Sequence, residues 1–223
     1  MWPVSLLLPL ASSVGYFLTG SFPLRSSATL LCLAIVLLSN VVQRRERNAW
    51  WIVFAFALSF AGDYVLGHWG GRFQGFVGGV ALFFLAHTGY IGYSLSRGRI
   101  IRPLLLLLLT VFGIYYLLLL HPAIANVVVS LAVLAYIIVS CISLAAAAGI
   151  CFPGNRLSRL LFVSGIGSLV FSDLLIAQKS FLHDATLYAA MMPTYFASQL
   201  LVTAALILPL TPPQRQTDSH SIH

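Results

Sequence analysis

The sequence predicts an all-α integral membrane protein with eight transmembrane helices, and three observations support this fold class. Of its 223 residues, 60% are hydrophobic and only 8% are charged, whereas a soluble domain carries about 25% charged residues. The hydrophobic residues form eight runs, each near the length of about 20 residues that a helix needs to cross a bilayer. Short segments connect these runs, so we expect almost no mass outside the membrane.

The eight expected helices follow one another in order. Their bounds are Pro3–Gly20, Ser26–Val42, Ala49–Gly67, Phe76–Ser96, Pro103–Leu120, Ile124–Ile150, Leu160–Gln178 and Ala185–Leu210. We assign residues 1–210 to one eight-helix transmembrane domain and residues 211–223 to a disordered cytoplasmic tail, because the tail is polar and contains two adjacent prolines. The first run lacks the positively charged start of a signal peptide, so we interpret it as a retained helix.

The basic residues predict the orientation. Nine of them fall at the side of the two termini, namely Arg44, Arg45, Arg47, Arg97, Arg99, Arg102, Arg156, Arg159 and Arg215. The opposite side carries only Arg25, Arg72 and Lys179. By the positive-inside rule both termini are cytoplasmic, which agrees with an even number of helices. We expect a multi-pass protein of the cell membrane. In a bacterium this is the inner membrane.

Two acidic residues, Asp63 and Asp173, fall inside expected helices, each about one turn from the outer end. An intramembrane carboxylate costs at least about 2.5–3.5 kcal/mol even on a lenient insertion scale. We expect no Lys or Arg at the same depth to offset this cost. The two aspartates are therefore expected to face each other, with one carboxyl protonated near neutral pH. A duplicated four-helix unit would explain why the two halves of the chain resemble each other in this respect.

Further polar residues lie at similar depth. His87 and Tyr90 share one helix face, Tyr195 and Gln199 share another, and Ser59 lies one turn before the first aspartate. We interpret the histidine as a proton-transfer or orienting partner of an aspartate. Tyr195 and Gln199 either bind the lipid head group, orient an aspartate, or join helices through hydrogen bonds. Ser59 either holds the Asp63 carboxylate or bonds back to its own helix.

Taken together and in order, these motifs resemble the YhhN family of lysoplasmalogenases. The residues that carry the resemblance are Gly62-Asp63, His87-x-x-Tyr90, Ser172-Asp173 with Leu174 and Ala177, and Tyr195-x-x-x-Gln199. The resemblance implies an eight-helix membrane hydrolase that cleaves the vinyl ether bond of a lysoplasmalogen. The products would be a fatty aldehyde and glycerophosphoethanolamine or glycerophosphocholine.

The chemistry of a vinyl ether predicts how the residues divide the work. Such an ether yields to acid, so a general acid must protonate the alkene carbon and another group must stabilise the oxocarbenium ion. We expect Asp63 and Asp173 to share these roles, as two carboxyl groups do in glycoside hydrolysis, with His87 relaying the proton. Which aspartate is the acid stays open. Ser59, Tyr90, Tyr195 and Gln199 are the candidates for binding the lysophospholipid. We expect no metal, no other cofactor and no nucleic acid partner.

Two other function classes stay open. A small transporter or proton-coupled carrier could use the same two aspartates as a relay, and it would release no aldehyde. A metal-dependent lipid hydrolase could use Asp63, His87 and Asp173 as ligands, and a chelator would inhibit it. We prefer the metal-free hydrolase because no further histidine lies within the expected helices.

Overall fold

The computed structural model of the protein describes residues 2–42, 47–69, 73–152, 155–184 and 186–208. Within these residues every named element is a helix, and Gly98 and Ile150 form an isolated β-bridge. The expected cytoplasmic tail, residues 211–223, lies outside the described residues. So do four of the basic residues used to predict the orientation, Arg44, Arg45, Arg72 and Arg215, and the orientation stays a prediction.

The helices follow the expected order, with differences at their ends. They are α1 (Trp2–Ser5), α2 (Leu7–Thr19), α3 (Phe22–Val42), η1 (Arg47–Ala49), α4 (Trp50–Trp69), α5 (Phe73–Leu95), α6 (Arg102–Tyr115), η2 (Tyr116–Leu120), α7 (His121–Ala123), α8 (Val127–Ala148), α9 (Arg156–Ala177), η3 (Gln178–Leu182), η4 (Tyr188–Ala190) and α10 (Met191–Ile207). In the described part of the chain, seven helical stretches are long and apolar enough to cross a membrane. The protein is therefore a multi-pass membrane protein.

The first expected span is too short in the structure to cross a bilayer as one helix. It is divided between α1 and α2, and α2 has only 13 residues, which is short of the about 20 needed to span a bilayer. Gly20 ends α2 with a left-handed backbone, φ 65°, a conformation that glycine adopts without steric cost. The prediction that this segment crosses the membrane as the eighth span stays a prediction.

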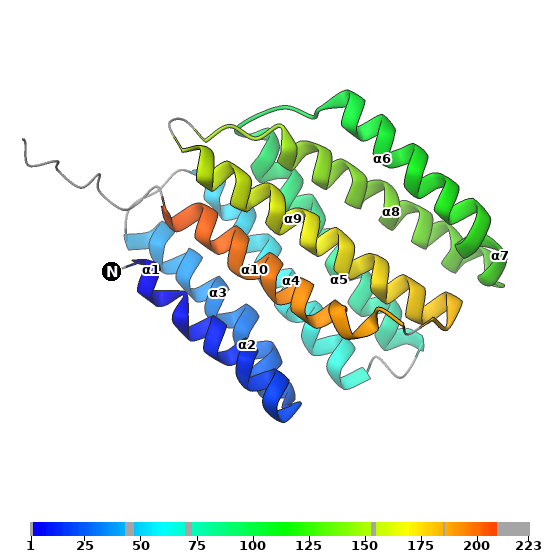
Figure 1. Cartoon of the computed structure of the whole chain (residues 1–223), viewed down its shortest axis with the longest axis horizontal. Coiled ribbons are helices and arrows are strands. Elements are labelled where there is room, and N and C mark those ends of the chain that lie inside the picture. The colour runs from blue at the N-terminus through cyan, green and yellow to red at the C-terminus, as the bar shows by residue number, and fades with distance from the viewer. Residues whose placement is uncertain (1, 43–46, 70–72, 153–154, 185, 209–223) are drawn as a thin grey trace, which may run out of the picture.

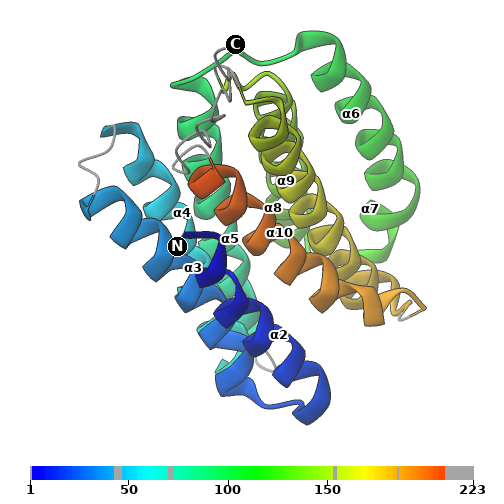
Figure 2. The same ribbon diagram turned by 60° about the vertical axis from the view of Figure 1, so that its left-hand side comes forward.

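Six helices form a closed ring in which each packs against the next. The order around the ring is α3, α4, α5, α8, α9 and α10, and α10 returns to α3. The other two long segments lie outside it, with α2 packed on α3 at one edge and α6 packed on α8 at the other (Figures 1 and 2). Side chains that point into the ring meet in its interior, and all the candidate site residues come from these six helices.

The largest helix contacts are those of α4 with α5 and of α9 with α10. Each pair contains one candidate aspartate, Asp63 in the first pair and Asp173 in the second. This arrangement is what a duplicated four-helix unit would produce, although the duplication itself stays a prediction.

Two asparagines and two π-helical segments shape the ends of α6, α8 and α9. Asn126 caps α8 by accepting hydrogen bonds from two backbone N–H groups, and Asn155 caps α9 in the same way with one. The segments η2 and η3 continue α6 and α9 with π-helical turns and contact each other. They bring Leu120 and Phe181 to the wall of the large cavity described below.

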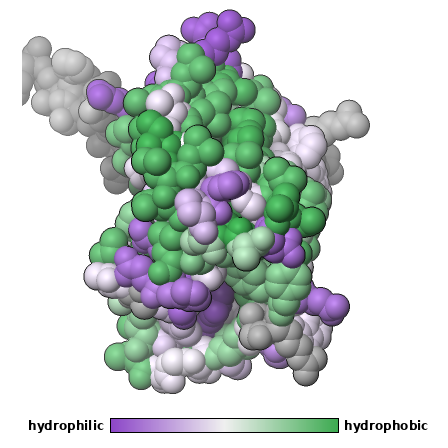
Figure 3. Space-filling view, turned by 90° about the vertical axis from the view of Figure 1, so that its right-hand side faces the viewer, coloured by the Kyte–Doolittle hydropathy of each residue, from purple (hydrophilic) through white to green (hydrophobic). Residues whose placement is uncertain are grey.

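The outer surface is largely apolar. The large apolar side chains that are exposed include Leu106, Leu117 and Leu118 on the α6 segment and Val127 and Leu131 on α8. Hydrophobic residues predominate over much of the face shown in Figure 3, while hydrophilic residues gather in its lower half. Such a surface is suited to contact with lipid chains rather than water.

The pair α4 and α5 approaches closely at Gly89. A Cβ atom added there would lie 2.7 Å from the carbonyl oxygen of Trp51 and 2.9 Å from Cβ of Ala55. We therefore predict that Gly89→Ala lowers the free energy of unfolding by about 1–3 kcal/mol through overpacking. Gly113→Ala on α6 is the matched control, because a Cβ atom there meets nothing within 4 Å. Thermal unfolding in detergent compares the two variants, and equal stability would contradict the close approach.

Candidate active site

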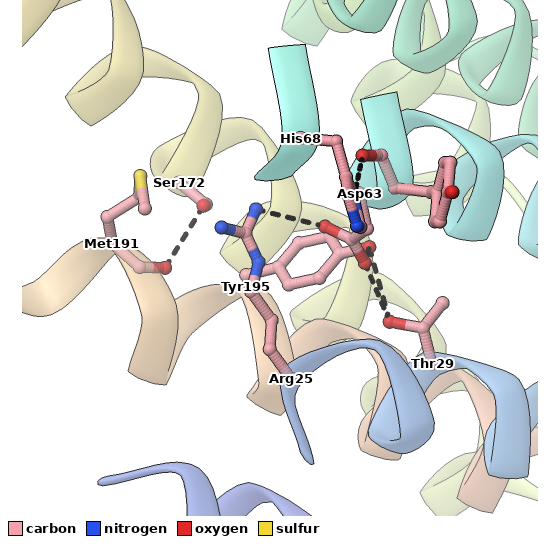
Figure 4. Close-up of polar contacts among 8 residues, drawn as sticks. Arg25, Thr29, Asp63, His68, Ser172, Met191 and Tyr195 are labelled. Atoms are coloured by element: carbon pink, nitrogen blue, oxygen red, sulfur yellow. Dashed lines mark hydrogen bonds and ion pairs between the residues drawn. The ribbon is translucent and has the colours of Figure 1, made fainter. Parts of the chain in front are cut away.

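Asp63 lies in the interior of the ring, where three side chains hydrogen-bond to its carboxylate. The guanidinium of Arg25 donates to Oδ1 at 3.2 Å, Thr29 donates to Oδ2 at 3.0 Å and the phenol of Tyr195 donates to Oδ2 at 2.7 Å (Figure 4). The aspartate comes from α4, its donors from α3 and α10, and its side chain is 1% exposed. A carboxylate with three donors, one of them a cation, has what an ionised group needs when it is buried.

The expectation that no Lys or Arg lies at the depth of the aspartates is wrong. The helix that we expected to begin at Ser26 begins at Phe22, so Arg25 belongs to its first turn. From there its side chain extends inward to Asp63, and Thr29 follows one turn later on the same face. The resulting ion pair offsets the cost of placing a carboxylate in the membrane.

Asp173 pairs with the buried histidine. On α9 its Oδ2 lies 3.0 Å from Nε2 of His87, which comes from α5. The side chain of His87 is 1% exposed and that of Asp173 is 10% exposed. Tyr136 of α8 lies against both, with its ring edge-on to the imidazole at 5.6 Å between centroids and its side chain within interaction range of the carboxylate. Among the described residues, the second imidazole nitrogen, Nδ1, has no hydrogen-bond partner.

The two aspartates line one small cavity of about 20 Å³ between the helices of the ring. Arg25, Ser172 and Tyr195 lie in the same wall. A cavity of this volume is large enough for about one water molecule. The carboxyls thus face a common space, as expected, while each keeps its own set of protein partners.

A second, much larger cavity lies on the other side of Asp173. Its volume is about 420 Å³, within the usual range for ligand sites of about 300–1,000 Å³. Its wall comes chiefly from α5, α8 and α9 and is almost entirely apolar. Four residues belong to both cavities: Leu66, Phe83, Ile176 and Asp173. Asp173 therefore lies where the large apolar cavity meets the small one, whose wall also carries Arg25 and Asp63.

The other predicted binding residues lie elsewhere. Ser59, Tyr90 and Gln199 are fully buried in the core, and none of them lines either cavity. The side chains of Ser59 and Gln199 neighbour the phenol of Tyr90, and Ser59 makes no hydrogen bond to Asp63. Of the four residues predicted to bind the substrate, Tyr195 alone borders either of these two cavities, and a role in substrate contact stays a prediction for all four.

Sequence reasoning missed three residues that the structure places at the aspartates. Arg25 and Thr29 are spaced four residues apart, and a helix start placed one turn earlier would have put both on one face. Tyr136 carries no comparable signal, because a single tyrosine in the apolar run of α8 resembles any other core aromatic residue.

The structure also bears on the metal-dependent alternative. Among the described residues, no group of three or more His, Cys, Asp or Glu side chains gathers closely enough to hold a metal ion. Asp63, His87 and Asp173 therefore do not form the ligand set that the sequence left open, because the first aspartate turns to Arg25 and the second to the imidazole.

Comparison with known protein families identifies the chain's relatives. The model of the YhhN family matches residues 22–206, from the first residue of α3 almost to the end of α10. The chain belongs to the YhhN family. The match includes both aspartates and all their partners, and it confirms the resemblance predicted from the motifs. YhhN is a lysoplasmalogenase-type family, so membership indicates a hydrolase. No curated protein and no solved structure matches this YhhN protein.

Proposed function

We propose that this YhhN protein is a lysoplasmalogenase. It hydrolyses the vinyl ether bond of a lysoplasmalogen in the cell membrane to a fatty aldehyde and glycerophosphoethanolamine or glycerophosphocholine. The observation that carries the proposal is the position of Asp173, between the large apolar cavity and the small cavity that Asp63 and Arg25 also line, and in contact with a buried histidine. In a vinyl ether the carbon that accepts the proton is the one on the chain side of the double bond. The acid therefore belongs at the boundary between the space for the hydrocarbon chain of the lipid and the space for the ether oxygen and glycerol.

In the first step Asp173 acts as the general acid. Its carboxyl proton moves to the chain-side alkene carbon, and the π electrons of the double bond form the new C–H bond. The other alkene carbon becomes part of an oxocarbenium ion with the ether oxygen, and Asp173 becomes a carboxylate. His87 is in position to orient this carboxyl and to exchange a proton with it at 3.0 Å. A positioned acid contributes about 10²–10⁴ to the rate.

In the second step water adds to the cation. The water loses one proton to the Asp173 carboxylate, and the product is a hemiacetal. The hemiacetal then loses its hydroxyl proton, the C–O bond to glycerol breaks, and the glycerol oxygen takes up a proton. The aldehyde and the glycerophospho-alcohol leave, and Asp173 holds its proton again.

Asp63 has a different role in this scheme. Its carboxylate is held by Arg25, Thr29 and Tyr195 and faces the same small cavity. A fixed negative charge beside a developing cation lowers the energy of the transition state. The two aspartates thus divide the work, with Asp173 transferring the proton and Asp63 stabilising the positive charge.

Aldehyde release by the purified protein tests the proposal. The substrate is a lysoplasmalogen in detergent micelles, and the control is the saturated alkyl-ether lysolipid with the same chain and head group. We expect aldehyde from the vinyl ether only, with the same rate in the presence of a chelator. Because micelles support no gradient, release also separates hydrolysis from transport. A folded protein that releases no aldehyde would overturn the proposal.

A further inference from the structure

We propose that the large cavity binds the single hydrocarbon chain of the lipid substrate, that the chain slides in from the bilayer between α5 and α8, and that the cavity limits its length. This inference rests on the proposed function and identifies the cavity that selects the hydrocarbon chain of the substrate.

The dimensions of the cavity suit one chain. Its wall runs along α8 from Val128 to Cys141, a separation of 13 residues or about 20 Å at 1.5 Å per residue. Along α9 it runs from Val170 to Ala177, 7 residues or about 10 Å, and η3 continues the wall to Phe181. The hydrocarbon core of a bilayer is about 30 Å thick, so the chains of one leaflet span about 15 Å. The cavity is therefore elongated along the helices and matches one extended lipid chain in length.

The walls suit a hydrocarbon. They are formed mainly by aliphatic and aromatic side chains, with Ser140 and Cys141 at one end, and within the described part of the chain Asp173 is the one acidic residue among them. A cavity with such walls does not attract a polar head group, since each buried polar group would lack hydrogen-bond partners. It does attract methylene groups, and it leaves the chain-side carbon of the vinyl ether double bond beside the Asp173 carboxyl.

The open side of the cavity lies between α5 and α8. Val77 on α5 and Val128 on α8 line the cavity and yet are 42% and 75% exposed. The alanines Ala81 and Ala132 are exposed wall residues of the same two helices. Their small side chains leave a gap on the lipid-facing side of the ring. A single-chain lipid can move through such a gap without leaving the membrane.

A bulky residue in the wall tests the inference. Ala132→Trp fills part of the cavity, and Ala81→Phe does so from the opposite helix. For each variant, kcat/KM is measured with lysoplasmalogens of increasing chain length at a constant mole fraction in one detergent. We expect the ratio of long-chain to short-chain kcat/KM to fall about tenfold or more. The matched controls are Leu131→Trp on α8 and Leu85→Trp on α5, which are exposed and do not line the cavity and should keep the wild-type ratio.

A binding measurement separates this inference from the proposed function. Saturated alkyl-ether lysolipids of increasing chain length are titrated against the wild type and Ala132→Trp, with binding read by calorimetry. Loss of long-chain binding in the variant supports the chain site even if no aldehyde is ever released. Aldehyde release with an unchanged chain preference in both cavity variants would overturn the chain site and leave the proposed function standing. If Ala132→Trp unfolds, the binding measurement uses Ala81→Phe on the opposite helix instead.

Discussion

Asp173→Asn is expected to reduce aldehyde release by about 10²–10⁴-fold, the contribution of a positioned acid. Asparagine has nearly the same shape and can still hydrogen-bond to His87, but it has no carboxyl proton to give to the alkene. The effect should appear in the chemical step, so single-turnover measurements with saturating lysoplasmalogen are the appropriate test. Thermal unfolding in the same detergent checks that the fold is kept.

The control for this variant is another aspartate exchanged in the same way. Asp184 lies in the segment between η3 and η4, and its carboxylate accepts hydrogen bonds from Thr186. Asp184→Asn should leave turnover unchanged. If folded Asp173→Asn kept near wild-type turnover, Asp173 would not be the acid, and the roles of the two aspartates would have to be exchanged or abandoned.

Asp63→Asn is expected to reduce both stability and activity, because it leaves the partly buried Arg25 guanidinium beside a neutral side chain. Removing one partner of a buried ion pair costs about 3–5 kcal/mol of the free energy of unfolding. Arg25→Gln should destabilise the protein in the same manner, by leaving the carboxylate unpaired. Denaturation in mixed micelles measures both effects, and Arg159→Gln serves as the control, because that arginine donates to a backbone carbonyl at an exposed position.

The double variant Arg25→Gln, Asp63→Asn separates the two losses. With both charges removed, no unpaired ion stays in the interior, so most of the stability should return. The activity should not return, because the fixed negative charge beside the oxocarbenium ion is gone. A double variant with wild-type activity would show that the pair serves only folding. A double variant less stable than either single one would show that the two residues do not act as a pair.

Much of the fold could be predicted because the bilayer sets the length of each helix. The helix expected over Ala49–Gly67 is α4, Trp50–Trp69, and the one expected over Phe76–Ser96 is α5, Phe73–Leu95. In both cases a long apolar run is bounded by polar residues or glycine. The start of α3 was misplaced because Arg25 interrupts the apolar run. Hydrophobicity alone treats a charge as a loop residue, even where the charge is neutralised by a partner 38 residues further along the chain.

The candidate site could be predicted only in part, because contacts between distant helices are not visible in the sequence. Asp63, Asp173 and His87 stand out because ionisable groups are costly inside a membrane. The pairing of His87 with Asp173 rather than Asp63 depends on how α5 and α9 pack around the ring, and no single sequence carries that information. The large cavity is equally hidden, because its alanines and valines look like any other lipid-facing residues.

The pair of Arg25 and Asp63 also bears on how the chain enters the bilayer during synthesis. The aspartate lies in α4, and its cationic partner lies in the preceding helix, α3, against which α4 packs. A helix that enters alone must meet the charge penalty of about 2.5–3.5 kcal/mol by itself. Two helices that enter together as a hairpin can join their charges at the translocon before either contacts lipid. We expect α3 and α4 to insert as one unit.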